Sequence, residues 1–178
     1  TVTPLAQFGN PKPRVFRIFK EKAVINRLGF NNKGVDYLVK RLKNRKYKGI
    51  VGVNIGANKN SKDQKRIDDY IECFRKVYKY SDYITVNISS PNTAGLRDLH
   101  DLDNIKNLIL NIENEAKLNN FNRPIFLKVS HDESAETIKS IADLINLSNL
   151  TGLIISNTTI DKEIPVSYTH LRAHETFT

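Results

Sequence analysis

Short polar side chains gather directly after an apolar segment in TVNISSPNTAGLR, at residues 85–97. Asn87, Ser89, Ser90, Asn92 and Thr93 place five hydrogen-bonding side chains within seven positions. Ser90 is the candidate proton acceptor, because serine is a weak base unless a partner helps its proton leave, and Thr93 is near enough to do so. A hydroxyl that caps a loop is the structural alternative for Ser90. The stretch predicts a binding loop at the end of a strand.

Other apolar segments end in the same way. Their terminal polar residues are Asn54, Asn87, Lys128 and the pair Ser156 and Asn157. In parallel α/β folds the carboxyl ends of the strands form the ligand face, so these side chains are expected to share one site. Neutral amides suit a flat, amide-rich ligand such as a flavin ring or a pyrimidine, and Lys128 offers a positive charge to an electron-rich ring.

The elements that must position these residues alternate along the chain. Buried strands are predicted at residues 49–56, 82–89, 124–130 and 151–157, and amphipathic helices at 34–46, 63–78, 104–118 and 134–147. Near-continuous apolar strands between helices indicate a parallel sheet, either open and doubly wound or a (β/α)₈ barrel. The sequence has no GxGxxG or GxxxxGK[ST] motif, which disfavours an open nucleotide-binding sheet. Residues 14–18 and 23–26 predict a hairpin, with an irregular loop as the alternative.

Composition limits the class of protein. The 178 residues are 39% hydrophobic and 26% charged, which suits one domain, and no apolar run reaches the ~20 residues that cross a bilayer. The single cysteine, Cys73, has helical apolar spacing and predicts a buried thiol, so no disulfide and no metal site are expected. The net charge of +9 is concentrated in residues 12–48. We interpret it as a solvated basic face and expect no nucleic-acid partner, although a basic nucleic-acid-binding module is the alternative from another class.

Five segments resemble one enzyme family in order and spacing. They are INRLGFNN (25–32), VNIGANK (53–59), DYITVNISSPNTAGLR (82–97), FLKVS (126–130) and ISNTT (155–159), and the chain resembles dihydroorotate dehydrogenase. The resemblance implies an FMN-containing (β/α)₈ TIM barrel, here incomplete with about five of the eight strand positions. It implies oxidation of (S)-dihydroorotate to orotate in pyrimidine biosynthesis. Serine at position 90 resembles the quinone-linked class 2 rather than class 1, which has cysteine there; class 1 or another pyrimidine-acting flavin barrel is the alternative.

The resemblance also implies residue roles. The catalytic set is Ser90 as the base, with Thr93 and Phe30 beside the route by which the proton leaves. The implied flavin contacts are Thr1, Asn54, Asn87, Lys128 and Ser156, where threonine is usual at the last position. The implied substrate contacts are Asn26, Arg27, Leu28, Gly29, Phe30, Asn87, Asn92, Asn157 and Thr158.

The resemblance fades near the end of the chain. Residues 1–165 are predicted to be a partial FMN-binding barrel domain, and residues 166–178 (VSYTHLRAHETFT) a non-native or disordered tail that resembles a translated cloning adapter. Alone, this polypeptide is expected neither to retain FMN well nor to turn over. The implied partners are dihydroorotate, orotate, quinone and a membrane surface, contacted through a region upstream. The implied location is the cytoplasmic face of a bacterial inner membrane, or alternatively the mitochondrial inner membrane.

Overall fold

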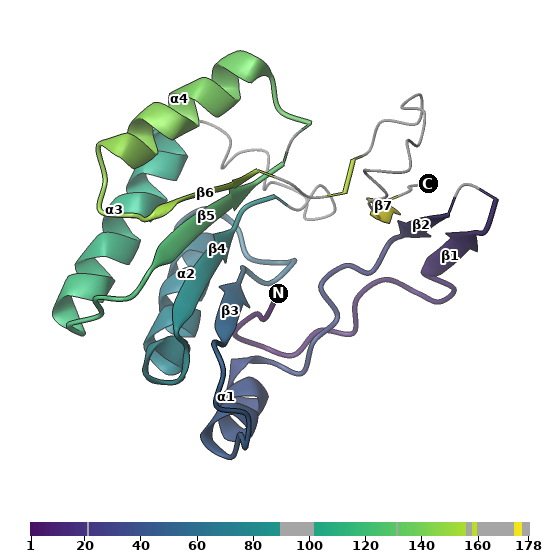
Figure 1. Cartoon of the computed structure of the whole chain (residues 1–178), viewed down its shortest axis with the longest axis horizontal. Helices are drawn as coiled ribbons and strands as arrows, with labels where there is room; N and C mark the ends of the chain where they lie inside the picture. The colour runs from purple at the N-terminus through teal and green to yellow at the C-terminus, as the bar shows by residue number, and fades with distance from the viewer. Residues whose placement is uncertain (21, 90–101, 131, 156–157, 160–172, 176–178) are drawn as a thin grey trace.

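A four-stranded parallel sheet forms the body of the protein (Figure 1). The computed structural model describes residues 1–20, 22–89, 102–130, 132–155, 158–159 and 173–175. The strands are β3 (Gly52–Ile55), β4 (Tyr83–Asn87), β5 (Ile125–Val129) and β6 (Gly152–Ile155), and they lie side by side in chain order. Every neighbouring pair is parallel, as the alternation of apolar strands and amphipathic helices predicted.

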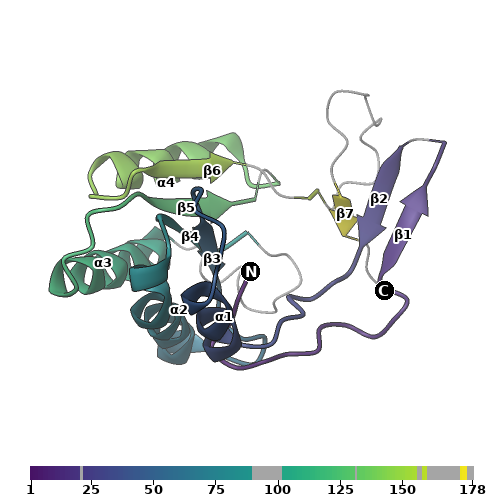
Figure 2. The same cartoon turned by 60° about the horizontal axis from the view of Figure 1, so that its bottom comes forward.

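Four helices cover one side of this sheet (Figures 1 and 2). They are α1 (Val35–Lys43), α2 (Asp63–Val77), α3 (Leu102–Leu118) and α4 (Ala135–Asn146), and a short 3₁₀ helix, η1 (Tyr78–Tyr80), follows α2. Their apolar faces bury Tyr70, Phe74 and Leu108 against Ile84 and Leu127 of the sheet. Burial of this apolar surface provides the main driving force for the fold.

Local chemistry explains where two elements begin and end. Helix α4 begins after Ser134, whose Oγ accepts a hydrogen bond of 3.1 Å from the Thr137 N–H and so caps the helix. Strand β4 was predicted to reach residue 89, but it ends at Asn87. The Asn87 Oδ1 accepts hydrogen bonds from the N–H (3.0 Å) and the Oγ (2.6 Å) of Ser89, and this side-chain turn bends the chain out of the ladder.

Cys73 of α2 is fully buried, as its helical spacing predicted. Burial, followed by the charges of Asp69 and Glu72, raises the pKa of its thiol. A thiol of this kind stays protonated and behaves as a small apolar side chain.

The first residues of the chain occupy a fifth position beside β3. Val2 and Ile55 form a parallel bridge, in which the Val2 N–H donates to the Asn54 carbonyl at 2.8 Å and the Gly56 N–H donates to the Val2 carbonyl at 2.9 Å. Thr1 is therefore brought to the carboxyl end of the sheet.

A second, smaller sheet lies beyond the carboxyl ends of these strands (Figure 1). Strands β1 (Val15–Ile18) and β2 (Ala23–Asn26) form the predicted antiparallel hairpin, with Val15 opposite Asn26. Strand β7 (Ala173–Glu175), from the segment predicted to be a tail, pairs in parallel with β2. The origin of that segment stays a prediction. In the part of the chain that the structure describes, no helix combines the length and apolarity needed to cross a bilayer.

Candidate functional site

Strand register places three predicted site residues on one face of the sheet. Asn54 lies opposite Thr85, and Asn87, two residues further along β4, lies opposite Lys128 of β5. Side chains alternate between the faces of a strand, so Asn54, Asn87 and Lys128 all leave the sheet on the same side. The opposite face carries the buried core residues that contact the helices. This arrangement follows from a period of two along each strand and from the parallel register between strands.

Hydrogen bonds join these side chains into one chain across three strands. The Lys128 Nζ donates to the Ser89 Oγ at 2.9 Å, and the Ser89 Oγ donates to the Asn87 Oδ1 at 2.6 Å. The Asn87 Nδ2 donates to the Thr1 Oγ1 at 2.8 Å, and the Thr1 Oγ1 donates to the Asn54 Oδ1 at 2.8 Å. Each hydroxyl accepts one hydrogen bond and donates another, so the direction of the whole chain is fixed.

Lys128 contributes the positive charge of this set. The ends of β3, β4 and β5 therefore present a positive charge together with two neutral amides and two hydroxyls. Such a set can bind a polar, electron-rich planar ligand, but it offers neither the carboxylate pair of a glycosidase nor the soft ligands of a zinc site.

The predicted substrate loop approaches the same strand ends at Gly56. A Cβ atom on Gly56 would lie 2.6 Å from the Thr1 Cγ2, 3.6 Å from the Phe30 ring and 3.9 Å from the Asn87 carbonyl oxygen. Phe30 was predicted to be a site residue although it is far from β4 in the sequence. In the fold it lies close to Thr1 and Asn87. A side chain at Gly56 would separate the loop from the strand ends.

The remaining residues of this loop follow β2. Asn26 is buried, and its Oδ1 accepts a hydrogen bond of 3.4 Å from the Leu28 N–H. The Arg27 Nε donates to the Pro13 carbonyl at 3.1 Å, so this guanidinium is directed toward the hairpin side. Leu28 is partly exposed, and Gly29 and Phe30 both have left-handed backbone conformations.

Helix α2 supports Asn87, at the centre of the site, from the side of the sheet that the helices cover. The buried Tyr70 hydroxyl donates a hydrogen bond of 2.8 Å to the Asn87 carbonyl oxygen. Burial raises the pKa of Tyr70, so the phenol remains a donor at neutral pH. The contact fixes the last residue of β4 against the core. Tyr70 was not among the predicted site residues, because its spacing on α2 is that of an ordinary core aromatic.

Ser89 is the functional candidate that sequence reasoning passed over. Only its place among the hydrogen-bonding residues of the opening motif pointed to it. It is almost fully buried and stands between Lys128 and Asn87.

Several predicted residues lie outside the described residues: Ser90, Asn92, Thr93, Ser156 and Asn157. Thr158 is described. Its Oγ1 is buried, and no hydrogen-bond partner for it is found among the described residues. A buried hydroxyl of this kind is costly unless something completes it, which is consistent with a ligand contact.

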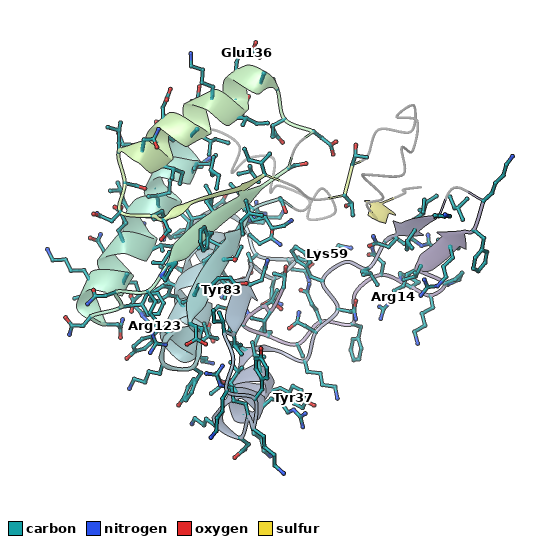
Figure 3. All side chains as sticks on the ribbon, viewed as in Figure 1. Arg14, Tyr37, Lys59, Tyr83, Arg123 and Glu136 are labelled. Atoms are coloured by element: carbon teal, nitrogen blue, oxygen red, sulfur yellow. The ribbon has the colours of Figure 1, made fainter. Side chains whose placement is uncertain are left out.

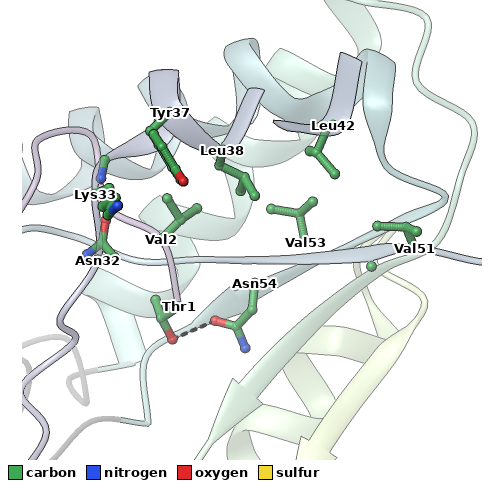
Figure 4. A pocket seen from close by; sticks show the side chains of 12 residues that line it. Thr1, Val2, Asn32, Lys33, Tyr37, Leu38, Leu42, Val51, Val53 and Asn54 are labelled. Atoms are coloured by element: carbon green, nitrogen blue, oxygen red, sulfur yellow. Dashed lines mark hydrogen bonds between the residues drawn. The ribbon is translucent and has the colours of Figure 1, made fainter. Parts of the chain in front are cut away.

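A pocket of about 370 Å³ lies next to this site, between α1 and β3 (Figure 4). Leu38 and Leu42 face Val53 across it, and the Thr1–Asn54 hydrogen bond runs along its rim. Apolar side chains supply most of its lining, so it offers few hydrogen bonds to an amide-rich ligand. We therefore place the candidate site at the polar strand ends.

Comparison with known proteins assigns this chain to a family. The family model of dihydroorotate dehydrogenase matches residues 1–176. The chain belongs to the dihydroorotate dehydrogenase family. The family predicted from the five motifs is thereby confirmed. Two relatives, each named dihydroorotate dehydrogenase (quinone), are 49% identical to this chain: one from Saccharophagus degradans over 167 residues and one from Legionella pneumophila strain Lens over 168. Each match covers 92% of this chain.

The matched relatives are longer. The chain spans about half the length of these curated relatives, 49% and 50%. Two crystal structures of DHODH from Eimeria tenella, one in complex with ferulenol and one ligand-free, superpose with a TM-score of 0.83 at 35% and 33% identity. They cover 91% and 97% of this chain, which in turn covers 50% and 55% of theirs. The predicted α/β fold is confirmed, and the TIM barrel typical of dihydroorotate dehydrogenases is partly present.

Proposed function

We propose that the protein to which this chain belongs oxidises (S)-dihydroorotate to orotate in pyrimidine biosynthesis, using FMN and passing electrons to a quinone. The observation that carries the proposal is the hydrogen-bonded chain from Lys128 through Ser89, Asn87 and Thr1 to Asn54. It supplies neutral amides, hydroxyls and one positive charge at the carboxyl ends of parallel strands. That is the ligand face of a (β/α)₈ barrel, and the donor set fits the polar edge of a flavin ring.

The proposed flavin contacts are Thr1, Asn54, Asn87, Lys128 and Ser156. When bound, FMN would accept the hydride that leaves C6 of dihydroorotate. Lys128 supports this assignment because a fixed positive charge beside an electron-rich ring stabilises added negative charge. Asn87 would keep its orientation throughout, since Tyr70, Ser89 and Thr1 all form hydrogen bonds with it.

The proposed substrate contacts are Asn26, Arg27, Leu28, Gly29, Phe30, Asn87, Asn92, Asn157 and Thr158. Ser90 would take the C5 proton, with Thr93 and Phe30 beside the route by which it leaves. The closeness of Phe30 to Gly56 supports this arrangement, because it brings the substrate loop to the strand ends. The buried Thr158 hydroxyl, for which the described residues provide no hydrogen-bond partner, supports a polar ligand near the end of β6.

We infer a quinone acceptor from serine at position 90 and from the quinone-linked names of the relatives. A peripheral location on the cytoplasmic face of a bacterial inner membrane follows as part of the same proposal, with contact to the membrane through a region outside this chain. The family favours this enzyme over a nucleic-acid-binding module, so the basic surface is interpreted as solvated.

Anaerobic addition of dihydroorotate to the full-length, FMN-loaded protein tests the function directly. We expect loss of the visible flavin absorbance, followed by its recovery when a soluble ubiquinone analogue is added. Recovery with fumarate but not with the quinone would instead indicate a class 1 acceptor. No loss of absorbance with dihydroorotate, in a protein that retains flavin, would reject the proposed substrate.

A further inference from the structure

The loop that follows β2 is held by hydrogen bonds from the segment that precedes β1. The Arg27 carbonyl accepts a hydrogen bond of 3.0 Å from the Asn10 Nδ2, and the Leu28 carbonyl accepts one of 3.2 Å from the Asn10 N–H. The Gly29 carbonyl accepts one of 3.2 Å from the Gln7 Nε2. Three successive carbonyl groups therefore each accept a hydrogen bond from the same segment, which fixes the path of the loop.

Backbone conformation makes this support necessary. Gly29 and Phe30 are consecutive residues with φ of 67° and 52°, a conformation that a residue other than glycine, such as Phe30, adopts only at a cost in energy. Gly9, with φ of 75°, lies so close that a Cβ atom there would be 2.2 Å from the Leu28 carbonyl oxygen. The two segments touch backbone to backbone, and the left-handed turn persists because its neighbours hold it.

Gln7 links this loop to the rest of the site. Its Oε1 accepts hydrogen bonds from the Asn58 Nδ2 at 2.9 Å and from the Lys59 N–H at 3.1 Å, while its Nε2 donates to Gly29. These partners identify which atom of the Gln7 amide is the oxygen and which is the nitrogen. Figure 3 shows Lys59 between the parallel sheet and the hairpin.

The link continues into the core through Asn58. The Asn58 N–H donates to the Oδ2 of Asp69 at 2.9 Å, and Asp69 is a buried carboxylate on α2. The Asn58 side chain also donates to the Leu5 carbonyl at 2.9 Å. A continuous set of hydrogen bonds therefore runs from α2 through Asn58 and Gln7 to Gly29.

We propose that Gln7 is a positioning residue for the substrate loop, acting through its Nε2–H···O=C bond to Gly29. The role assigned to the loop rests on the proposed function. The hydrogen bonds of Gln7 are observed independently of that function. The Gln7 side chain contacts both the loop after β3, at Asn58 and Lys59, and the turn at Gly29. Without its donor the Gly29 carbonyl loses its partner, the left-handed pair relaxes, and Phe30 moves away from Gly56.

The decisive variant is Gln7→Glu. It keeps the size of the side chain and the acceptor for Asn58 and Lys59, but at neutral pH it places a carboxylate oxygen opposite the Gly29 carbonyl. The matched control is Gln64→Glu on the exposed surface of α2, which adds the same charge at a side chain that donates a hydrogen bond to Asp68. We expect amide hydrogen exchange of residues 27–32 to quicken about tenfold in Gln7→Glu and to be unchanged in Gln64→Glu.

Low pH supplies the rescue that a merely structural role would not show. Below the ordinary carboxyl pKa of about 4.3 the introduced side chain is protonated and can donate to Gly29 again. The exchange ratio between Gln7→Glu and wild type at residues 27–32, normalised to α4, should therefore return toward one as the pH falls from about 7 to about 4. A ratio near one at both pH values would overturn the proposal. If Gln7→Glu loosens α4 as well, Gln7→Met replaces it, and faster exchange confined to residues 27–32 is the expected result.

Orotate affinity separates this inference from the proposed function. In the full-length protein we expect orotate to bind about tenfold more weakly to Gln7→Glu than to Gln64→Glu. Wild-type protein that binds no orotate would reject the proposed substrate, while the exchange experiment would still decide whether Gln7 positions the loop. Equal orotate affinity in both variants, together with faster loop exchange, would show that the loop does not serve this ligand and would overturn the inferred role.

Discussion

The Lys128 ammonium donates a 2.9 Å hydrogen bond to Ser89, the residue directly before the proposed base Ser90. This bond ties the end of β5 to the end of β4 and aligns Asn87 between Ser89 and Thr1. One cation therefore orders the polar residues of three neighbouring strands.

Replacing Lys128 by methionine removes the charge and keeps most of the side-chain volume. We expect the full-length protein to bind FMN at least about tenfold more weakly, because a hydrogen bond to a charged group contributes about 1.5–3 kcal/mol. Titration followed by flavin fluorescence measures the affinity. Lys117→Met, on the exposed face of α3, is the control. Equal affinities in wild type and Lys128→Met would remove Lys128 from the flavin site.

Ser90→Ala tests the proposed base. We expect the rate of flavin reduction by dihydroorotate to fall by about 10²–10⁴-fold, the usual contribution of a positioned base, with FMN content unchanged. Ser90→Cys should also be slower than wild type in a class 2 site. Ser140→Ala, on α4, should match wild type. If Ser90→Cys kept the full rate and Ser90→Ala changed nothing, the class 2 assignment would fail.

Tyr70→Phe tests how firmly α2 fixes the end of β4. The variant leaves the Asn87 carbonyl without its 2.8 Å donor in a dry environment, so we expect unfolding free energy to fall by about 1–3 kcal/mol. Urea unfolding followed by circular dichroism measures the change. Tyr37→Phe, at a half-exposed hydroxyphenyl group on α1, should change stability by less than about 0.5 kcal/mol. Similar losses in both variants would mean that the Tyr70 hydroxyl has no special role.

Glu115 and Arg75 predict a specific pH dependence of stability. The hydrogen bond from Arg75 at 2.8 Å, helped by Asn119, lowers the pKa of Glu115 below its usual 4.5. A carboxyl group with a lowered pKa stabilises the folded state above its unfolded-state pKa, and this contribution is lost as the pH falls through the folded-state value. Because the Arg75 side chain is largely exposed, we expect no more than about 1 kcal/mol.

Urea unfolding of wild type and Glu115→Gln from about pH 7 to about pH 3 provides the measurement. The stability difference between the two proteins should be constant above about pH 5 and should shrink below the unfolded-state pKa. Asp143→Asn, at an exposed position on α4, supplies the control. A difference that stays constant down to the lowest pH would show that the Arg75–Glu115 pair does not perturb the titration.

Sequencing the source locus across the codon of Pro165 tests the predicted end of the native sequence. We expect the reading frame to continue into a glycine-rich segment and further strands in place of VSYTHLRAHETFT. The basis for this expectation is the resemblance of VSYTHLRAHETFT to a translated cloning adapter. A locus that encodes residues 166–178 as written would make them native and would identify β7 as a genuine strand.

The sequence by itself determined the order of the elements and the polar residues at the strand ends. Apolar periodicity is a local property, so the strands of the parallel sheet, the helices, the hairpin and the buried Cys73 could be predicted, and the motif around Asn87 pointed to a site. Strand β7 was not predicted, because residues 166–178 show no such periodicity. Strand ends were predicted less well, since β4 stops where the Asn87 side chain captures Ser89. The family motifs added Phe30 and its loop, which periodicity alone would not have connected with the strands.

Only the tertiary structure decided which of these residues meet. The hydrogen bond from Asn87 to Thr1 joins positions 86 apart in the chain, and that from Thr1 to Asn54 joins positions 53 apart. Contacts of this range depend on strand register and on the place of Val2 beside β3, neither of which leaves a periodic trace in the sequence. For the same reason, the sequence alone did not reveal the roles of Ser89, Tyr70 and Gln7. Their residue types are ordinary for a turn, a core and a loop, and their roles arise from the partners that the fold brings to them.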